Sequence, residues 1–181
     1  MNLQTGGLQP LRRILEKLFA LLIGPQDRRE ALAKRRRKLQ PGGPYIGCAV
    51  LCEKVLQERD GVISLVRIID RTIISGRGPD APEELPPIPL THTVFVALKS
   101  GLARGKYVVS IQPHAPSGRA IGDAIQVAVL FEGEERGVNV IASVTLQVED
   151  EGLYWFDVAI EGHSLTRIPL RVLYQRTGIT M

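Results

Sequence analysis

Apolar and polar positions alternate with a period of two from residue 45 onward, and β-branched residues dominate the alternating runs. Eight such runs are separated by turn residues at regular intervals, with no helical pattern between them. They predict an antiparallel β-sandwich of about eight strands, immunoglobulin-like or jelly-roll-like, with a closed barrel as the alternative. The expected strands cover residues 45–58, 62–75, 91–99, 106–113, 123–131, 138–149, 152–161 and 164–174.

Glycine and proline mark the clearest breaks between these strands. Asp60 and Gly61 supply the backbone conformation that a tight hairpin requires, so they predict that the first two strands pair directly. Residues 76–89 contain five of the chain's twelve prolines, which exclude both helix and interior strand and predict a long surface loop. Pro169 lies inside the last expected strand and favours a sheet edge or a bulge there.

Residues 1–43 follow a different pattern. Leucine and isoleucine recur every three or four positions over residues 10–23, which predicts an amphipathic helix. Gly24 and Pro25 favour a break and a second helix that runs to about Leu39, where a Pro/Gly cluster ends it. We therefore expect two parts, a helical extension over 1–43 and a β-sandwich domain over 44–181.

Charge separates the same two parts. Residues 1–43 contain ten Lys or Arg and three acids, net +7, whereas residues 44–181 contain thirteen and sixteen, net −3. The cations of the extension are candidates for contact with a protein partner, another copy of the chain, an anionic membrane surface or nucleic acid. An ordinary solvated helix is the alternative. The candidate residues are Arg12, Arg13, Lys34, Arg35, Arg36, Arg37 and Lys38.

The remaining composition is that of a globular protein, with mean hydropathy +0.04 and 23% charged residues. Cys48 and Cys52 lie four residues apart on one expected strand, about 13 Å between Cα atoms, which is too far for a disulfide. Two free thiols and the absence of a signal-peptide pattern favour a cytoplasmic location.

No motif for catalysis, cofactor or metal binding occurs in the sequence, so we expect no enzyme activity, no cofactor and no metal site. One weak cluster is testable. If successive strands alternate in direction, Arg77, His114, Ser117 and Arg119 meet at one end of the sandwich. Together they could hold a carboxylate or phosphate, although ordinary solvated loops are the simpler interpretation. Asp157 and Arg167 are expected to form a cross-strand ion pair, as are Asp70 and Arg71.

Four segments resemble a bacterial family of small β-rich domains of unknown function. They are SLVRIIDR at 64–71, FVALK at 95–99, GLYWFDV at 152–158 and LTRIPL at 165–170. The resemblance covers about residues 46–174 and omits the basic extension. It implies an immunoglobulin-like sandwich and no particular activity.

The sequence thus favours a non-enzymatic binding or assembly module whose basic helices dock onto a partner, another copy or an anionic surface. Two alternatives stay open. One is a small-ligand protein or enzyme that uses the loops around Arg77, His114 and Arg119. The other is nucleic-acid binding through residues 34–38.

Overall fold

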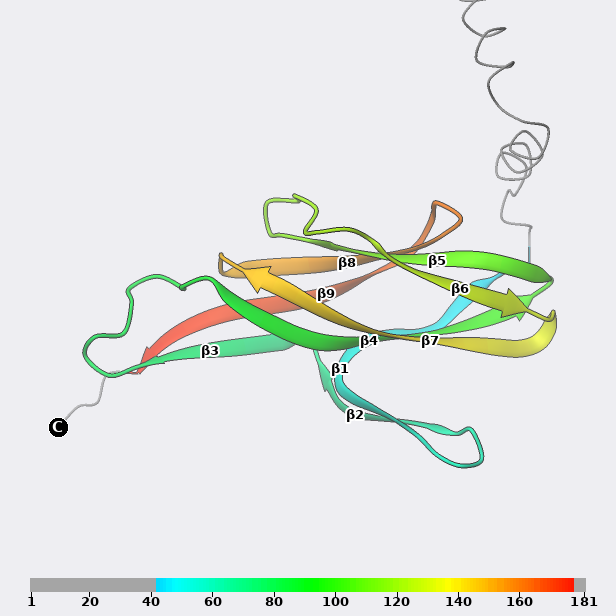
Figure 1. The fold of residues 1–181 in the computed structure, drawn as a ribbon, viewed down its shortest axis with the longest axis horizontal. Coiled ribbons are helices and arrows are strands. Elements are labelled where there is room, and N and C mark those ends of the chain that lie inside the picture. Colours follow the sequence, from blue (N-terminus) through cyan, green and yellow to red (C-terminus); the bar gives the residue numbers. More distant parts are fainter. Residues whose placement is uncertain (1–41, 178–181) are drawn as a thin grey trace, which may run out of the picture. The chain divides into compact units, whose positions relative to one another are not determined.

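Nine β-strands form residues 42–177, the part of the chain that the computed structural model describes (Figure 1). The helices expected in the basic extension lie outside this range. The strands are β1 (Tyr45–Gln57), β2 (Ile63–Ile69), β3 (Arg71–Arg77), β4 (Ile88–Gly101), β5 (Gly105–His114), β6 (Ile125–Phe131), β7 (Glu134–Val148), β8 (Gly152–Ile160) and β9 (His163–Thr177).

The strands form two separate sheets, so the mainly-β sandwich is confirmed and the closed barrel is wrong. The four-stranded sheet has the order β2-β1-β4-β7, and the five-stranded sheet has the order β3-β9-β8-β5-β6. Alternate residues of each strand face inward. On β8, for example, Tyr154, Phe156, Val158 and Ile160 are at most 1% exposed. The strict alternation that the aromatic run 154–156 obscures in the sequence is therefore present in the structure.

The hairpin of β1 and β2 confirms the Asp60-Gly61 turn. Gly61 has φ +85, and the amide of Glu58 donates to the carbonyl of Val62 at 2.9 Å. The pairing of β1 with β4 ends at Cys52, after which β1 continues paired with β2 alone. The end of the β1–β2 hairpin consequently extends beyond β4 (Figure 1).

The single strand expected over 62–75 is wrong, because the chain changes sheets at Asp70. β2 pairs with β1 in one sheet, and β3 pairs with β9 in the other. The β3–β9 pair is parallel, so the sandwich is mixed instead of wholly antiparallel. Neither glycine nor proline marks this crossing, which is why local pattern alone does not reveal it.

Pro169 lies on β9 before the point at which β3 begins to pair with that strand. The amide of Arg171 donates to the carbonyl of Asp70 at 2.8 Å, so alternate amides of β9, including the position of Pro169, face the β3 side. Because β3 begins opposite Arg171, no strand pairs with β9 beside Pro169. The missing N–H is tolerated there. β9 thus pairs with β8 up to Val172 and with β3 from Arg171 onward, so within the described residues it has a strand on both sides only at Arg171 and Val172.

Three loops meet at one end of the sandwich, as the sequence predicted. They connect β3 to β4, β5 to β6 and β7 to β8 (Figure 1). The long proline-rich loop is packed against the domain, because Ala81 and Leu85 are buried and the Tyr174 hydroxyl donates to the carbonyl of Pro82 at 2.8 Å. This end contains His114, Ser117 and Arg119, and β3 ends there at Arg77.

Candidate functional site

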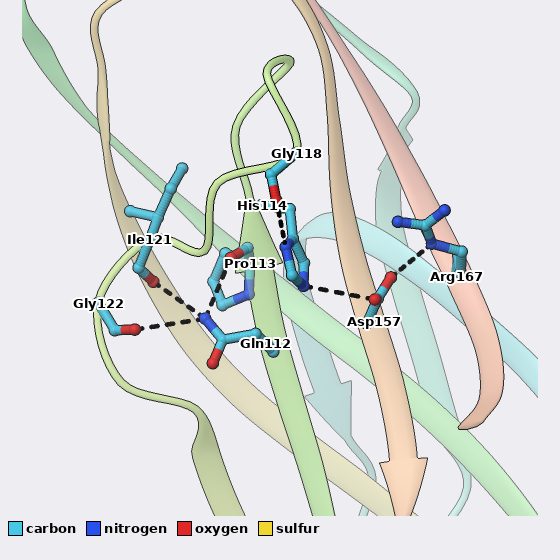
Figure 2. A network of polar contacts seen from close by, with 8 residues as sticks. All are labelled: Gln112, Pro113, His114, Gly118, Ile121, Gly122, Asp157 and Arg167. Carbon is cyan, nitrogen blue, oxygen red and sulfur yellow. Dashed lines mark hydrogen bonds and ion pairs between the residues drawn. The ribbon is translucent and has the colours of Figure 1, made fainter. Parts of the chain in front are cut away.

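A row of polar side chains crosses the outward face of the five-stranded sheet. Gln112 of β5 is in register with Asp157 of β8, which is in register with Arg167 of β9. Arg167 Nε donates to Asp157 Oδ1 at 2.5 Å, and Asp157 Oδ2 lies 3.3 Å from His114 Nε2 (Figure 2). The expected Asp157–Arg167 ion pair is confirmed. Asp157 therefore links three adjacent strands.

His114 uses both ring nitrogens in contacts with the protein. Its Nε2 faces Asp157, and its Nδ1 lies 3.2 Å from the carbonyl oxygen of Gly118 (Figure 2). Both partners are acceptors, and the tautomer of the ring decides to which of them an N–H donates. A general base needs a free nitrogen within reach of the proton it removes. In this structure His114 holds the β5–β6 turn to the sheet and has no nitrogen left for a ligand.

The turn after His114 is closed by its own backbone. The amide of Ala115 donates to the carbonyl of Arg119, and the amide of Gly118 donates to that of Ala115, both at 2.8 Å. Gly118 has φ +84, which favours glycine at this position. Ser117 Oγ accepts from the Arg119 amide at 3.5 Å, and Arg119 Nη2 lies 3.3 Å from Glu149 Oε2. His114, Ser117 and Arg119 are therefore close together, with the guanidinium already paired.

Gln112 anchors the far side of the same loop, a role that the sequence analysis missed. Its Nε2 lies 3.1 Å from the carbonyl oxygen of Pro113 and 3.3 Å from those of Ile121 and Gly122 (Figure 2). An amide group two residues before a glycine-rich loop is the sequence signal that points to this role.

Arg77 does not join this cluster. It lies on β3, and β9 and β8 separate β3 from β5. Three strand spacings place it about 14 Å across the sheet from β5. The structure thus brings together three of the four predicted residues and leaves Arg77 beside β9.

Two more arginines, Arg71 and Arg171, lie on the same outward face as Arg77. Arg71 of β3 is in register with Arg171 of β9, so two cationic side chains project side by side from neighbouring strands. Among the side chains that the structure describes in residues 42–177, no carboxylate forms an ion pair with Arg71, Arg77 or Arg171. The expected ion pair between Asp70 and Arg71 is therefore wrong. This arrangement depends on the parallel β3–β9 pairing and was not predicted.

Trp155 lies between the arginines on this face. It is opposite Pro169 on β9 and is only partly buried. The Arg167 guanidinium carbon lies 4.9 Å from the centre of the Trp155 ring, a cation–π contact. Together these side chains form a surface that we call the arginine face. It consists of Arg71, Arg77, Arg167, Arg171 and Trp155.

Two titratable groups elsewhere are affected by burial. Burial lowers the pKa of His92, whose Nε2 lies 3.4 Å from Thr72 Oγ1. Burial also raises the pKa of the Cys52 thiol, which is 0% exposed. Both cysteines are free, as the spacing predicted.

The other predicted features are limited by the described range. The candidate cations of the extension, Arg12, Arg13 and Lys34 to Lys38, lie outside residues 42–177. Within that range, no group of three or more His, Cys, Asp or Glu is placed to hold a metal ion. The same residues contain no helix that is long and apolar enough to cross a membrane.

One protein-family model matches this chain. The model of a family of unknown function, DUF6941, matches residues 47–173, which is most of the sandwich. The chain belongs to the DUF6941 family. The resemblance inferred from the sequence, to an uncharacterised family over about 46–174, is therefore confirmed.

Other comparisons add little about this DUF6941 member. No curated protein matches the chain. Among solved structures it is similar to the crystal structure of the CARDB domain of the PF1109 protein from Pyrococcus furiosus, in complex with di-metal ions. The identity is 10% and the TM-score 0.36, with 76% of this chain and 100% of the other covered.

Proposed function

We propose that this protein is a non-enzymatic binding or assembly module, and that its arginine face binds an acidic segment of a partner protein. The proposal also retains the assignment of the sandwich to the immunoglobulin-like class and a contribution from the basic extension to partner binding. The observation that carries it is the side-by-side placement of Arg71 and Arg171, neither of which forms an ion pair with a carboxylate of the described side chains.

Two like charges in register on neighbouring strands destabilise a sheet. Stability alone therefore does not account for this pair, whereas a carboxylate lying between the two guanidinium groups would relieve the repulsion. Arginine presents a planar fork that binds a carboxylate through two parallel hydrogen bonds. Arg71 and Arg171 thus form a site whose charge is complementary to an aspartate or glutamate side chain.

The surroundings of this pair favour a protein segment over a free ion. Ile73, next to Arg71 on the outward side of β3, is 49% exposed. Trp155 contributes a partly exposed aromatic ring whose position is fixed by Arg167. Arginine, tryptophan and other aromatic residues are enriched at the centres of protein interfaces. The face therefore combines charge with apolar surface, which an acidic peptide containing apolar residues would match.

The test compares variants of the full chain in binding to a fluorescein-labelled 20-residue polyglutamate, measured by fluorescence anisotropy at low salt. We expect the double variant Arg71→Ala/Arg171→Ala to weaken binding by about tenfold or more, because each of its two substitutions removes a charge-assisted hydrogen bond. Arg59→Ala, in the β1–β2 turn, is the matched control for the loss of an exposed arginine. Any contribution from residues 1–41 is the same in all of these proteins.

Equal binding of polyglutamate by the double variant and wild type would contradict the proposal. A 20-nucleotide single-stranded DNA is measured in parallel. If the double variant loses affinity for DNA but not for polyglutamate, the face binds nucleic acid instead of an acidic protein segment, and the proposal is wrong.

A further inference from the structure

We propose that the acidic segment bound by the arginine face is an extended peptide that adds as an antiparallel strand to the free edge of β3, with two acidic side chains six residues apart. This mode of binding rests on the proposed function and adds the conformation and spacing of the partner segment. β3 is the first strand of the order β3-β9-β8-β5-β6, so β9 is its one paired neighbour among the described residues. In Figure 1, β3 lies beside β9 at the border of this sheet.

The backbone of β3 offers hydrogen-bonding groups to an added strand. The amide of Arg171 donates to the carbonyl of Asp70 at 2.8 Å, so in this parallel pair the even-numbered residues of β3 direct their backbone groups toward β9. The N–H and C=O groups of the odd-numbered residues therefore point away from β9. No backbone group of another described residue pairs with them. The free edge thus presents a donor and an acceptor at each of four alternate positions, Arg71, Ile73, Ser75 and Arg77.

The side chains of the same four residues project from the outward face and are exposed. Arg71 and Arg77 stand at the two ends of this row, six residues or about 20 Å apart. Neither forms an ion pair with a carboxylate of the described side chains. Ile73 lies between them and is 49% exposed. A strand placed along this edge therefore meets a cation near each end and apolar surface in between.

The charges on β3 decide which strand can add to it. Like charges directly opposite each other in a strand pair repel, so a second copy of β3 in full antiparallel register, with Arg71 opposite Arg77 at both ends, is disfavoured. The acids nearest in the sequence, Asp70 and Asp80, lie outside β3, so the strand itself carries cations alone. Arg171, beside Arg71, adds to the positive charge at that end. Charges on an edge strand prevent indiscriminate pairing, and here they select an acidic strand over neutral and basic ones.

The phase of the free backbone groups also fixes how an antiparallel strand would lie. Antiparallel pairing is the more stable arrangement per residue, and residues directly opposite each other exchange both hydrogen bonds. Each odd-numbered residue of β3 would therefore bond the peptide residue that faces it. A nine-residue peptide with glutamate at its second and eighth positions and valine at its sixth places the acids opposite Arg77 and Arg71, and the valine opposite Ile73.

The first measurement tests the spacing of the acids. Two fluorescein-labelled peptides, completed with threonine, are compared by fluorescence anisotropy with the full chain at low salt: the peptide described above and an isomer whose second glutamate is moved to the fifth position. We expect the six-residue spacing to bind about tenfold more tightly, because the isomer directs one acid to the other side of the strand and loses a charge-assisted pair. Arg77→Ala should abolish this preference, and Arg59→Ala, the matched control, should retain it. Both peptides carry the same charge, so attraction to other cations of the chain is equal.

The second measurement tests strand addition through N-methylation of alternate peptide amides. Methyl groups on the fourth and sixth residues, whose N–H groups would bond β3, should weaken binding by about tenfold or more. Methyl groups on the fifth and seventh residues, whose N–H groups would face away, should change the affinity by less than about twofold and are the matched control.

Equal affinity for the two spacings would overturn the inference, as would methylation effects that are equal or in the reverse order. These failures are distinguishable from failure of the proposed function, which is judged by whether polyglutamate binding depends on Arg71 and Arg171. If that dependence is observed while the two spacings bind equally, the arginine face binds acidic segments without adding them as a strand to β3.

Discussion

Replacing Arg71 by glutamate should stabilise this protein while it weakens binding at the arginine face. Most substitutions destabilise, so an increase in stability is an informative outcome. The expectation follows from the register, in which Arg71 and Arg171 occupy neighbouring positions of a parallel pair and neither forms an ion pair with a described carboxylate. Glutamate at position 71 replaces a repulsive pair by an attractive one.

The magnitude follows from the two contributions. A like-charged cross-strand pair costs, and an opposite-charged pair contributes, about 0.2–1 kcal/mol each. Both side chains are exposed, so solvent screening limits the gain in the free energy of unfolding to about 1 kcal/mol. For a domain of this size, that corresponds to an increase of about 4 °C in Tm.

A double-mutant cycle in urea isolates this interaction. Arg71→Glu and Arg171→Glu should each raise the free energy of unfolding, and the double variant, which places two glutamates side by side, should return close to wild type. Arg59→Glu controls for the change in net charge. High salt should reduce the gain of each single variant. If both single variants are less stable than wild type, or if their effects add, the two arginines do not interact as described.

Three further predictions concern buried groups. Burial lowers the pKa of His92 below its ordinary value of 6.5, so protonation favours the unfolded chain. The free energy of unfolding should therefore fall as pH drops below about 6.5. The fall should be smaller in His92→Gln. At neutral pH a thiol reagent should label the half-buried Cys48 in the native protein, and Cys52 only on unfolding; equal rates would contradict the packing. Tyr154→Phe removes the hydrogen bond to the carbonyl of Asp150 at 2.9 Å and should cost about 1 kcal/mol in urea unfolding, whereas an unchanged midpoint would show that this bond contributes nothing.

The strands and turns were largely predictable because their signals are local. Alternation identifies the inward residues of each strand, and Asp60-Gly61 identifies the first hairpin. The sequence also placed the proline-rich loop and the β5–β6 loop at one end, since that inference needs only alternating strand directions. The Asp157–Arg167 pair followed from the last hairpin, whose two strands are adjacent in sequence.

The arginine face was not predictable because it depends on pairing over long distances in the chain. Arg71 and Arg171 are separated by a hundred residues, and nothing near Asp70 signals that the chain crosses between sheets. Arg77 was assigned to the loop cluster for the same reason. A continuous apolar run looks alike whether it stays in one sheet or passes to the other.

The position of β7 at a sheet edge also depends on pairing between residues that are far apart in the chain. The uncharged run over residues 137–148 is visible in the chain, but its place at an edge depends on the strand order, which puts β4 on one side and no strand of the described residues on the other. An interior strand with this composition would be unremarkable, since strands paired on both sides need no protection against pairing with another chain.

The parallel pairing of β3 with β9 is the basis of the arginine face, and a nuclear Overhauser experiment on the labelled protein tests it most directly. Cross-strand contacts should link Arg71 with Arg171, Ile73 with Leu173 and Ser75 with Gln175, in ascending order along both strands. Contacts in the reverse order, or none between residues 71–77 and 171–177, would contradict the fold and the function proposed from it.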